Sequence, residues 1–181
     1  MIVSGLYRVA VHPVRRIAAA ALAATVVCVP TTAHAVGTTV SVKGAHGQTL
    51  TVTQARKLAS KGQYVTVTGR HFDETVGIYV ALCVLHGKGT IPTPCGGGVD
   101  KTGASGASQW VSSNPPPYGI GLAVPYTVGG SFKVRLKVGP VIGAFDCRKI
   151  KCGIITKADH LNEADRSADV VIPVTFATAK K

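Results

Sequence analysis

The sequence lacks several features that would assign it to a membrane protein or a common enzyme class. Its longest mainly apolar run, Ile17 to Pro30, has 14 residues, whereas a transmembrane helix needs roughly 20. There is no Gly-x-Ser-x-Gly element, which excludes the usual nucleophile elbow of a hydrolase. There is no Cys-x-x-Cys pair, which excludes a thioredoxin-like redox centre, and there is no internal repeat.

Acidic residues are also scarce, with 8 Asp and Glu against 20 Lys and Arg, for a net charge of +12. In an exported protein, such an excess suits acidic surfaces such as wall polymers, anionic lipid or nucleic acid. Because the basic residues are spread along the chain, a solvated surface that keeps the protein soluble is the favoured explanation. Two groups form the candidate basic surface: Lys133, Arg135 and Lys137 on one strand face, and Arg148, Lys149 and Lys151 on a hairpin.

The first 35 residues predict a secretory signal peptide. Arg8, Arg15 and Arg16 form a charged start, an apolar run follows, and small residues precede a cleavage site after Ala35. Arg15 and Arg16 leave the twin-arginine route open beside the general one, and Cys28 is considered as a lipid-anchor site but lacks the required flanking residues. We expect a secreted protein, released or associated with the cell wall, with no membrane span in its mature form.

The mature part, residues 36–181, is expected to be a single domain with a net charge of +9 once the three arginines are removed. Its four cysteines are Cys83, Cys95, Cys147 and Cys152, and an even number in an exported chain implies disulfides. Four cysteines permit three connectivities. The local pairings Cys83–Cys95 and Cys147–Cys152 are favoured because each pair brackets turn-like residues.

Alternating apolar and polar residues predict an all-β protein of seven or eight short strands, which is typical of a β-sandwich. The expected strands are 38–43, 50–53, 64–68, 78–85, 109–112, 131–138, 151–156 and 170–176. Segment 53–60 has some helical character and is expected to form a single turn. Pro173 within the last strand predicts an edge position or a bulge.

A long Gly- and Pro-rich segment, residues 96–130, interrupts this pattern. It carries the single tryptophan, Trp110, and two tyrosines, Tyr118 and Tyr126, and a disordered linker rarely contains aromatic residues. We therefore expect a strand followed by a structured loop.

Three stretches resemble the neocarzinostatin family of actinobacterial secreted proteins: GQYVTVTGRHF (62–72), GIYVALC (77–83) and FDCRKIKC (145–152). The resemblance extends over residues 36–176. It implies an immunoglobulin-like, seven-stranded antiparallel β-sandwich with two short-range disulfides, and both local cysteine pairs match these bridges in order and approximate spacing.

The resemblance also implies a carrier that holds a reactive chromophore in a cleft beside one sheet. Leu85 stands where family members carry an aromatic residue, and only the short segment 139–145 precedes the last hairpin. We therefore expect an apolar small molecule of another kind, as in an antibiotic-carrier-like protein. The expected cleft lining is Leu85, Trp110, Tyr118, Leu122, Tyr126 and Phe145, although aromatic residues also commonly fill a core.

Two other chemistries are considered and set aside. A zinc site built from the cysteines, His86 and His160 would lose its sulfur ligands to the disulfides, so neither a metal nor a cofactor is expected. His71, Asp73, Asp159, His160 and Ser167 supply the residue types of a hydrolytic triad, but no nucleophile motif accompanies them.

The function predicted from the sequence is therefore non-enzymatic binding by a monomer. The alternative is a cell-envelope or host-interaction module. Such a module would bind an acidic macromolecule, a wall polymer or DNA, through the basic surface. Aromatic residues are not interleaved with the basic ones, which argues against stacking of single-stranded nucleic acid.

Overall fold

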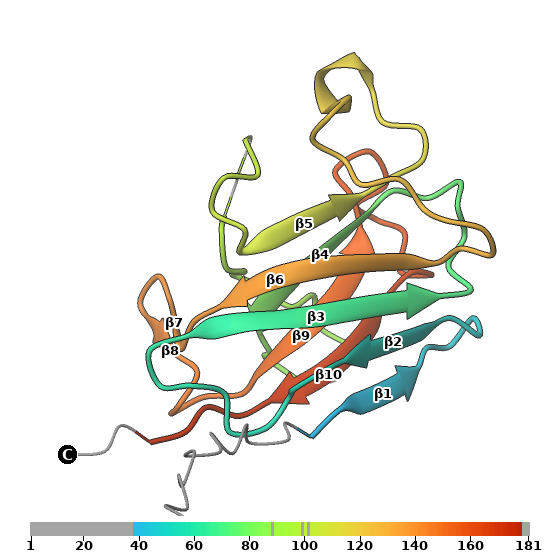
Figure 1. The fold of residues 1–181 in the computed structure, drawn as a ribbon. Helices are drawn as coiled ribbons and strands as arrows, with labels where there is room; N and C mark the ends of the chain where they lie inside the picture. The colour runs from blue at the N-terminus through green and yellow to red at the C-terminus, as the bar shows by residue number, and fades with distance from the viewer. Residues whose placement is uncertain (1–37, 88, 99, 101, 179–181) are drawn as a thin grey trace, which may run out of the picture. The chain divides into compact units, whose positions relative to one another are not determined.

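The computed structural model describes residues 38–178 apart from residues 88, 99 and 101, so the expected signal peptide lies outside the described residues (Figure 1). The first sheet contains, in spatial order, β1 (Val40–Lys43), β2 (Thr49–Val52), β3 (Gln63–Arg70) and β6 (Phe132–Val138). The second sheet contains β10 (Val170–Val174), β9 (Cys152–Ala158), β4 (Ile78–Val84) and β5 (Ser108–Val111). All neighbouring strands are antiparallel.

Strand β6 shows how the residue alternation builds the layers. Phe132, Val134, Leu136 and Val138 are buried, and the three basic residues between them are exposed. Side chains alternate between the two faces of a strand, so one face of β6 enters the core and the other meets solvent.

The main core lies between the two sheets. It takes Leu50, Val52, Val65, Val67 and Leu136 from the first sheet, and Ile78, Val80, Leu82, Ile154 and Ile172 from the second. This confirms the predicted all-β sandwich. The second sheet is also partly covered on its outer face, where Ala81, Cys83 and Ile155 form a smaller buried cluster. Strand β4 is therefore apolar almost throughout, as its sequence predicts.

The connectivity is immunoglobulin-like. Strands β3 and β6 pair in one sheet, and β4, β9 and β10 are neighbours in the other, as strands B–E and C–F–G are in that fold. The two sheets hold eight strands rather than seven, because β1 and β2 form a hairpin at the first position. Gly47, with a φ of 93°, lies in the turn of this hairpin, and glycine adopts such a conformation without steric cost.

Both predicted disulfides, Cys83–Cys95 and Cys147–Cys152, are present. Strand β10 lies at a sheet edge, which confirms the position predicted from Pro173. The Gly- and Pro-rich segment supplies β5 and a short 3-10 helix, η1 (Pro117–Gly119), and so is a strand followed by an ordered loop as expected.

The helical turn expected at 53–60 is wrong. Ala55 and Leu58 are both fully buried, and their backbones bond to the end of the chain, Thr175 N to Ala55 O at 3.0 Å and Leu58 N to Thr175 O at 2.9 Å. Burial against this last segment, rather than a helix, accounts for the spacing of the two apolar residues. A two-stranded ribbon that the alternation did not predict, β7 (Val141–Ile142) with β8 (Phe145–Asp146), follows β6.

Candidate ligand-binding site on the second sheet

A hollow of about 630 Å³ lies beside the outer face of the second sheet. We call it the Leu85 hollow. Its lining consists of Leu85, His86, Gly87, Gly89, Thr90, Pro92, Lys151, Arg166, Asp169 and Val171. The lining thus comes from the segment after β4, the residue before β9, the β9–β10 connection and β10 itself.

A glycine in β9 allows the apolar part of this lining to form. A Cβ placed on Gly153 would lie 3.1 Å from Leu85 Cδ1 and 3.2 Å from Val171 Cγ1. These distances are shorter than ordinary van der Waals contacts, so the two side chains approach each other over the backbone of β9. Leu85 and Val171 also pack against the small cluster around Ile155. The outer face is therefore apolar where the hollow meets it.

The loop that forms one wall is anchored at both ends. The Cys83–Cys95 disulfide joins its base, and backbone hydrogen bonds run from Thr93 N to Val84 O at 3.1 Å and from Val84 N to Pro94 O at 3.0 Å. The side chain of His86 contacts the Thr93 carbonyl through Nε2. A disulfide and two backbone hydrogen bonds thus fix this wall to β4, the strand from which the loop starts.

Charged groups complete the lining. Arg166 and Asp169 form an ion pair. Burial raises the pKa of the Asp169 carboxyl, and the nearby Arg166 opposes this rise. Asp169 Oδ1 is buried and has no hydrogen-bond partner among the described residues. The hollow therefore combines apolar side chains with a few polar groups, the usual composition of a small-molecule site.

Of the six residues predicted to line a cleft, Leu85 lines this hollow, and Phe145 is adjacent to it. The Phe145 ring packs edge-on against His86, with 6.4 Å between ring centroids and an interplanar angle of 85°. Sequence reasoning missed His86 and Val171 as lining residues. Val171 points outward from the edge strand β10 and lies next to Gly153 of β9. This position is the signal that could have identified it.

Trp110 and Tyr118 come together elsewhere, at the β5 end of the sheet. Their rings stack with centroids 6.3 Å apart, and Trp110 also lies within 6.2 Å of Tyr79 and 5.3 Å of His160. Trp110 is 7% exposed. It is therefore largely enclosed by this aromatic cluster, which we define as Tyr79, Trp110, Tyr118 and His160.

His160 joins the two tyrosines of the aromatic cluster. Its Nδ1 is 2.5 Å from the Tyr79 hydroxyl, and its Nε2 is 2.7 Å from the Tyr118 hydroxyl. Burial raises the pKa of Tyr79 to about 12, with a smaller contribution from the Asp159 carboxylate. His160 lies in a turn, as the sequence suggested, but its ring also links β4 to the loop after β5.

The remaining two predicted residues are separate from both groups. Tyr126 lies in the main core, where its ring packs against Phe132 and its hydroxyl donates to the Val76 carbonyl at 3.0 Å. Burial raises the pKa of Tyr126. Leu122 is half-buried in the loop, with its backbone N–H donating to Gly119 O at 3.0 Å. The six residues thus do not converge on one cleft.

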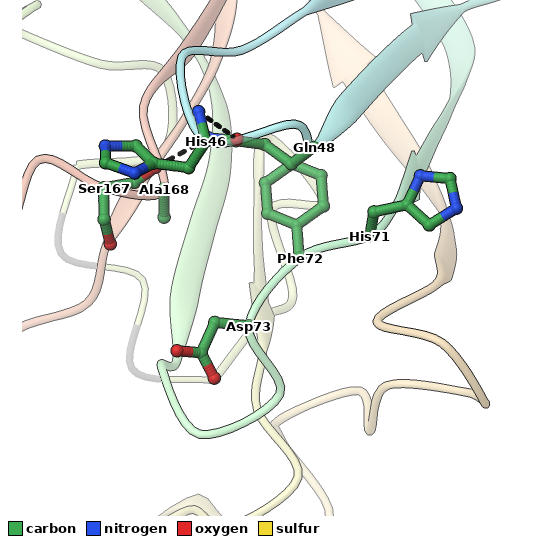
Figure 2. A pocket seen from close by; sticks show the side chains of 7 residues that line it. All are labelled: His46, Gln48, His71, Phe72, Asp73, Ser167 and Ala168. Atoms are coloured by element: carbon green, nitrogen blue, oxygen red, sulfur yellow. Dashed lines mark hydrogen bonds between the residues drawn. The ribbon is translucent and has the colours of Figure 1, made fainter.

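A second hollow, of about 320 Å³, has a polar lining of His46, Gln48, His71, Asp73 and Ser167, with Phe72 and Ala168 (Figure 2). Gln48 crosses it: its side chain accepts from His46 N at 3.0 Å and donates to Ser167 O at 2.6 Å. Gln48 is 2% exposed, so these bonds satisfy a buried amide.

Three of the residue types of a triad, His71, Asp73 and Ser167, line this second hollow. Asp73 instead accepts two bonds from Thr75, and these lower the pKa of its carboxyl. The His71 ring is directed away from Asp73 in Figure 2. Within the described part of the chain, no hydrogen bond links a serine hydroxyl to a histidine, the arrangement that activates a nucleophile.

The described residues contain no group of three or more His, Cys, Asp or Glu side chains placed to hold a metal ion. In the same part of the chain, no helix has the length and apolar character needed to cross a membrane.

The two basic groups differ in their environment. Arg148 donates to both oxygens of Asp146, at 2.8 and 2.9 Å, and these bonds lower the pKa of Asp146 to about 2. Lys149 and Lys151 are exposed beside this pair. The three basic residues of β6 are exposed on the outer face of the first sheet.

Comparison with solved structures finds a similarity to macromomycin. The two chains are 22% identical, the match covers 72% of this chain and 100% of that chain, and the TM-score is 0.48. No protein-family model matches the sequence, and neither does any curated protein.

Proposed function

We propose that this protein is a secreted, non-enzymatic binding protein that holds an apolar small molecule in the Leu85 hollow. The observation that carries the proposal is the hollow itself, of about 630 Å³, bounded by Leu85 and Val171 and walled by a disulfide-anchored loop. Small-molecule sites commonly enclose roughly 300–1,000 Å³ and are mainly apolar with a few polar groups. The two disulfides support an oxidising, extracellular location.

The resemblance of residues 36–176 to the neocarzinostatin family supports the same direction, because that family implies a carrier with its cleft beside one sheet. The aromatic cluster is a weaker candidate for the site. Trp110 is enclosed by its neighbours, so its ring offers little surface to a ligand.

Titration of the protein with the apolar dye Nile red tests the proposal. Val171 is half-buried on an edge strand, so Val171→Phe places a larger side chain in the hollow without entering the main core. We expect this variant to bind the dye at least about tenfold more weakly, because the larger side chain blocks an apolar surface that the dye would otherwise contact. The matched control is Val128→Phe, which makes the same substitution at a turn residue that is 97% exposed.

Unchanged affinity in Val171→Phe would place the dye elsewhere and overturn the proposed site. Absence of dye binding by the unmodified protein, together with no co-purified small molecule by mass spectrometry, would overturn the proposed function.

A second candidate function is binding of an acidic macromolecule through the basic surface. It is favoured by one observation: within the described residues, the three cations of β6 make no ion pair. Retention of the protein on an anion-bearing polymer, with elution at moderate salt, is the test of this second function.

A further inference from the structure

The outer face of the first sheet carries five cations. They are Lys43 on β1, Arg70 on β3, and Lys133, Arg135 and Lys137 on β6, and all five are exposed. We call these five residues the basic face. Strand register places Lys43 in line with Thr49 and Arg70, and Thr68 beside Lys133. The cations therefore lie on both edge strands, β1 and β6, and at the end of β3.

Among the described residues, no carboxylate forms an ion pair with a cation of the basic face. All 8 acidic residues of the sequence lie outside the eight strands of the two sheets. The two ion pairs among the described residues, Arg148 with Asp146 and Arg166 with Asp169, involve other cations. An acid-free array of cations on one surface produces a positive potential that attracts anions.

Hydroxyl groups fill the space between the cations. The other outward side chains of β1, β2 and β3 include Ser41, Thr49, Thr51, Thr66 and Thr68. Ser41 and Thr51 hydroxyls are 2.8 Å apart and bonded, and both lie in the row that leads through Thr68 to Lys133. Hydroxyls both donate and accept, so this surface matches a partner that carries anionic groups and hydroxyls.

Tyr64 is the single aromatic residue among the outward side chains of these strands, and one side of its ring contacts Arg135. The Arg135 guanidinium lies 4.6 Å from the ring centroid, in a cation–π arrangement. Stacking of unpaired bases needs free aromatic faces, and reading of a duplex needs an element that enters a groove. The basic face offers a single aromatic ring, with one side occupied by Arg135, and its four-stranded sheet is wider than the helix or two-stranded ribbon that a major groove admits, so it suits neither form of nucleic acid.

We propose that the basic face binds a linear polyol-phosphate polymer of the poly(glycerol phosphate) type. Successive outward residues of β6 lie about 6.8 Å apart, which is comparable with the length of one glycerol-phosphate unit. Lys133, Arg135 and Lys137 then meet successive phosphates, and the hydroxyls of Thr66 and Thr68 on the neighbouring strand β3 meet the polyol. This inference rests on the second candidate function and specifies its partner and its surface.

The test measures binding of the protein to poly(glycerol phosphate) at several salt concentrations. The variant K133Q/R135Q/K137Q removes the cations of β6 from exposed positions. We expect its affinity at low salt to fall at least about tenfold, and the slope of log K against log salt to decrease by about 2. The matched control, R56Q/K57Q/K61Q, removes the same number of exposed cations from the connection between β2 and β3. It is expected to change the affinity less than about threefold.

Equal losses in the two triple variants would overturn the proposal, because net charge alone would then explain binding. Tighter binding of duplex DNA, or of vesicles containing phosphatidylglycerol, than of poly(glycerol phosphate) at the same salt would also overturn it. Failure of the unmodified protein to bind any of these anions would instead remove the second candidate function itself. Urea midpoints of both variants equal to that of the unmodified protein establish that folding is unaffected.

Discussion

The indole N–H of Trp110 donates a hydrogen bond to Oδ2 of Asp159, at 2.9 Å, and both residues are buried. Asp159 Oδ1 accepts a second bond, from Leu161 N at 3.0 Å. One carboxylate thus joins the edge strand β5 to the turn after β9. That turn carries His160, so the Trp110–Asp159 bond also holds the aromatic cluster in place.

Replacement of Asp159 by alanine is expected to destabilise the fold by about 2 kcal/mol, because the buried indole N–H of Trp110 and the partly buried N–H of Leu161 lose their acceptor. The emission of Trp110, the single tryptophan, is expected to shift to longer wavelength as water reaches the ring. Urea unfolding followed by fluorescence measures both effects. The control is Glu163→Ala, an exposed acid in the same connection, with an expected change within about 0.5 kcal/mol. Equal midpoints in the two variants would contradict this account.

Gly119 is expected to be intolerant of even a methyl group. A Cβ at this position would lie 2.4 Å from Trp110 Cζ3 and 2.9 Å from Pro115 Cβ. Gly119→Ala should therefore displace the loop or the ring, at roughly 1–3 kcal/mol. Gly121, in the same loop, has open space around its Cα but a φ of 82°, so Gly121→Asn is a control that tests conformation without crowding. Thermal unfolding measures the melting temperature of both variants. A larger decrease in Gly119→Ala than in Gly121→Asn is expected if crowding against Trp110 is the larger effect.

The two disulfides are expected to differ in their effects. On loop-closure entropy alone, Cys147→Ala/Cys152→Ala should cost about 2 kcal/mol, and Cys83→Ala/Cys95→Ala about 3 kcal/mol. The second change should also weaken dye binding, because the Cys83–Cys95 bridge anchors a wall of the Leu85 hollow. Urea unfolding and Nile red titration of each variant measure stability and binding separately. If dye binding weakened only in the Cys147→Ala/Cys152→Ala variant, the result would contradict the role of the Cys83–Cys95 loop as a wall of the Leu85 hollow.

Asp146 provides a test of pH dependence. Its pKa in the folded state is lowered to about 2 by bonds from Arg148, so its contribution to stability is present above its unfolded value and is lost as the pH falls through about 2. Arg148→Gln is expected to return the pKa of Asp146 towards the ordinary aspartate value of 3.8. Carboxyl carbon shifts in an NMR titration report this directly. Lys149→Gln is the control, with a smaller expected change, since Lys149 acts through charge alone; equal shifts in both variants would refute the role of the Arg148 bonds.

Most strands were predictable from the sequence because they bury one face and therefore alternate, and β4 was predictable because it is a continuous apolar run buried on both faces. All eight expected strands are present, and β6 matches its expected range within one residue. The ribbon of β7 and β8 was not predictable, since each strand has 2 residues and no period can be read from so short a stretch. The helical turn expected at 53–60 was wrong because apolar spacing reports burial, and an irregular segment that bonds to Thr175 produces the same spacing of Ala55 and Leu58.

The candidate site was less predictable than the fold. Leu85 was identified through the family resemblance, as the residue two positions after Cys83 where members carry an aromatic side chain, and it lines the hollow. Val171 and Arg166 come from segments some 80 residues further along the chain, and strand pairing brings them there. Residue type alone predicted ligand contact for Trp110 and Tyr126. The partners that enclose them, Asp159 and Phe132, depend on tertiary packing.

The separation of acidic residues from strands has a consequence for how this protein can change over evolutionary time. Every acidic side chain lies in a connection or in the ribbon, whereas the first sheet carries cations and hydroxyls on its outward face. Connections tolerate substitution and insertion more readily than strands do. Mutation in the connections can therefore adjust the isoelectric point and the direction of the molecular dipole while the charged sheet face and the core remain as they are.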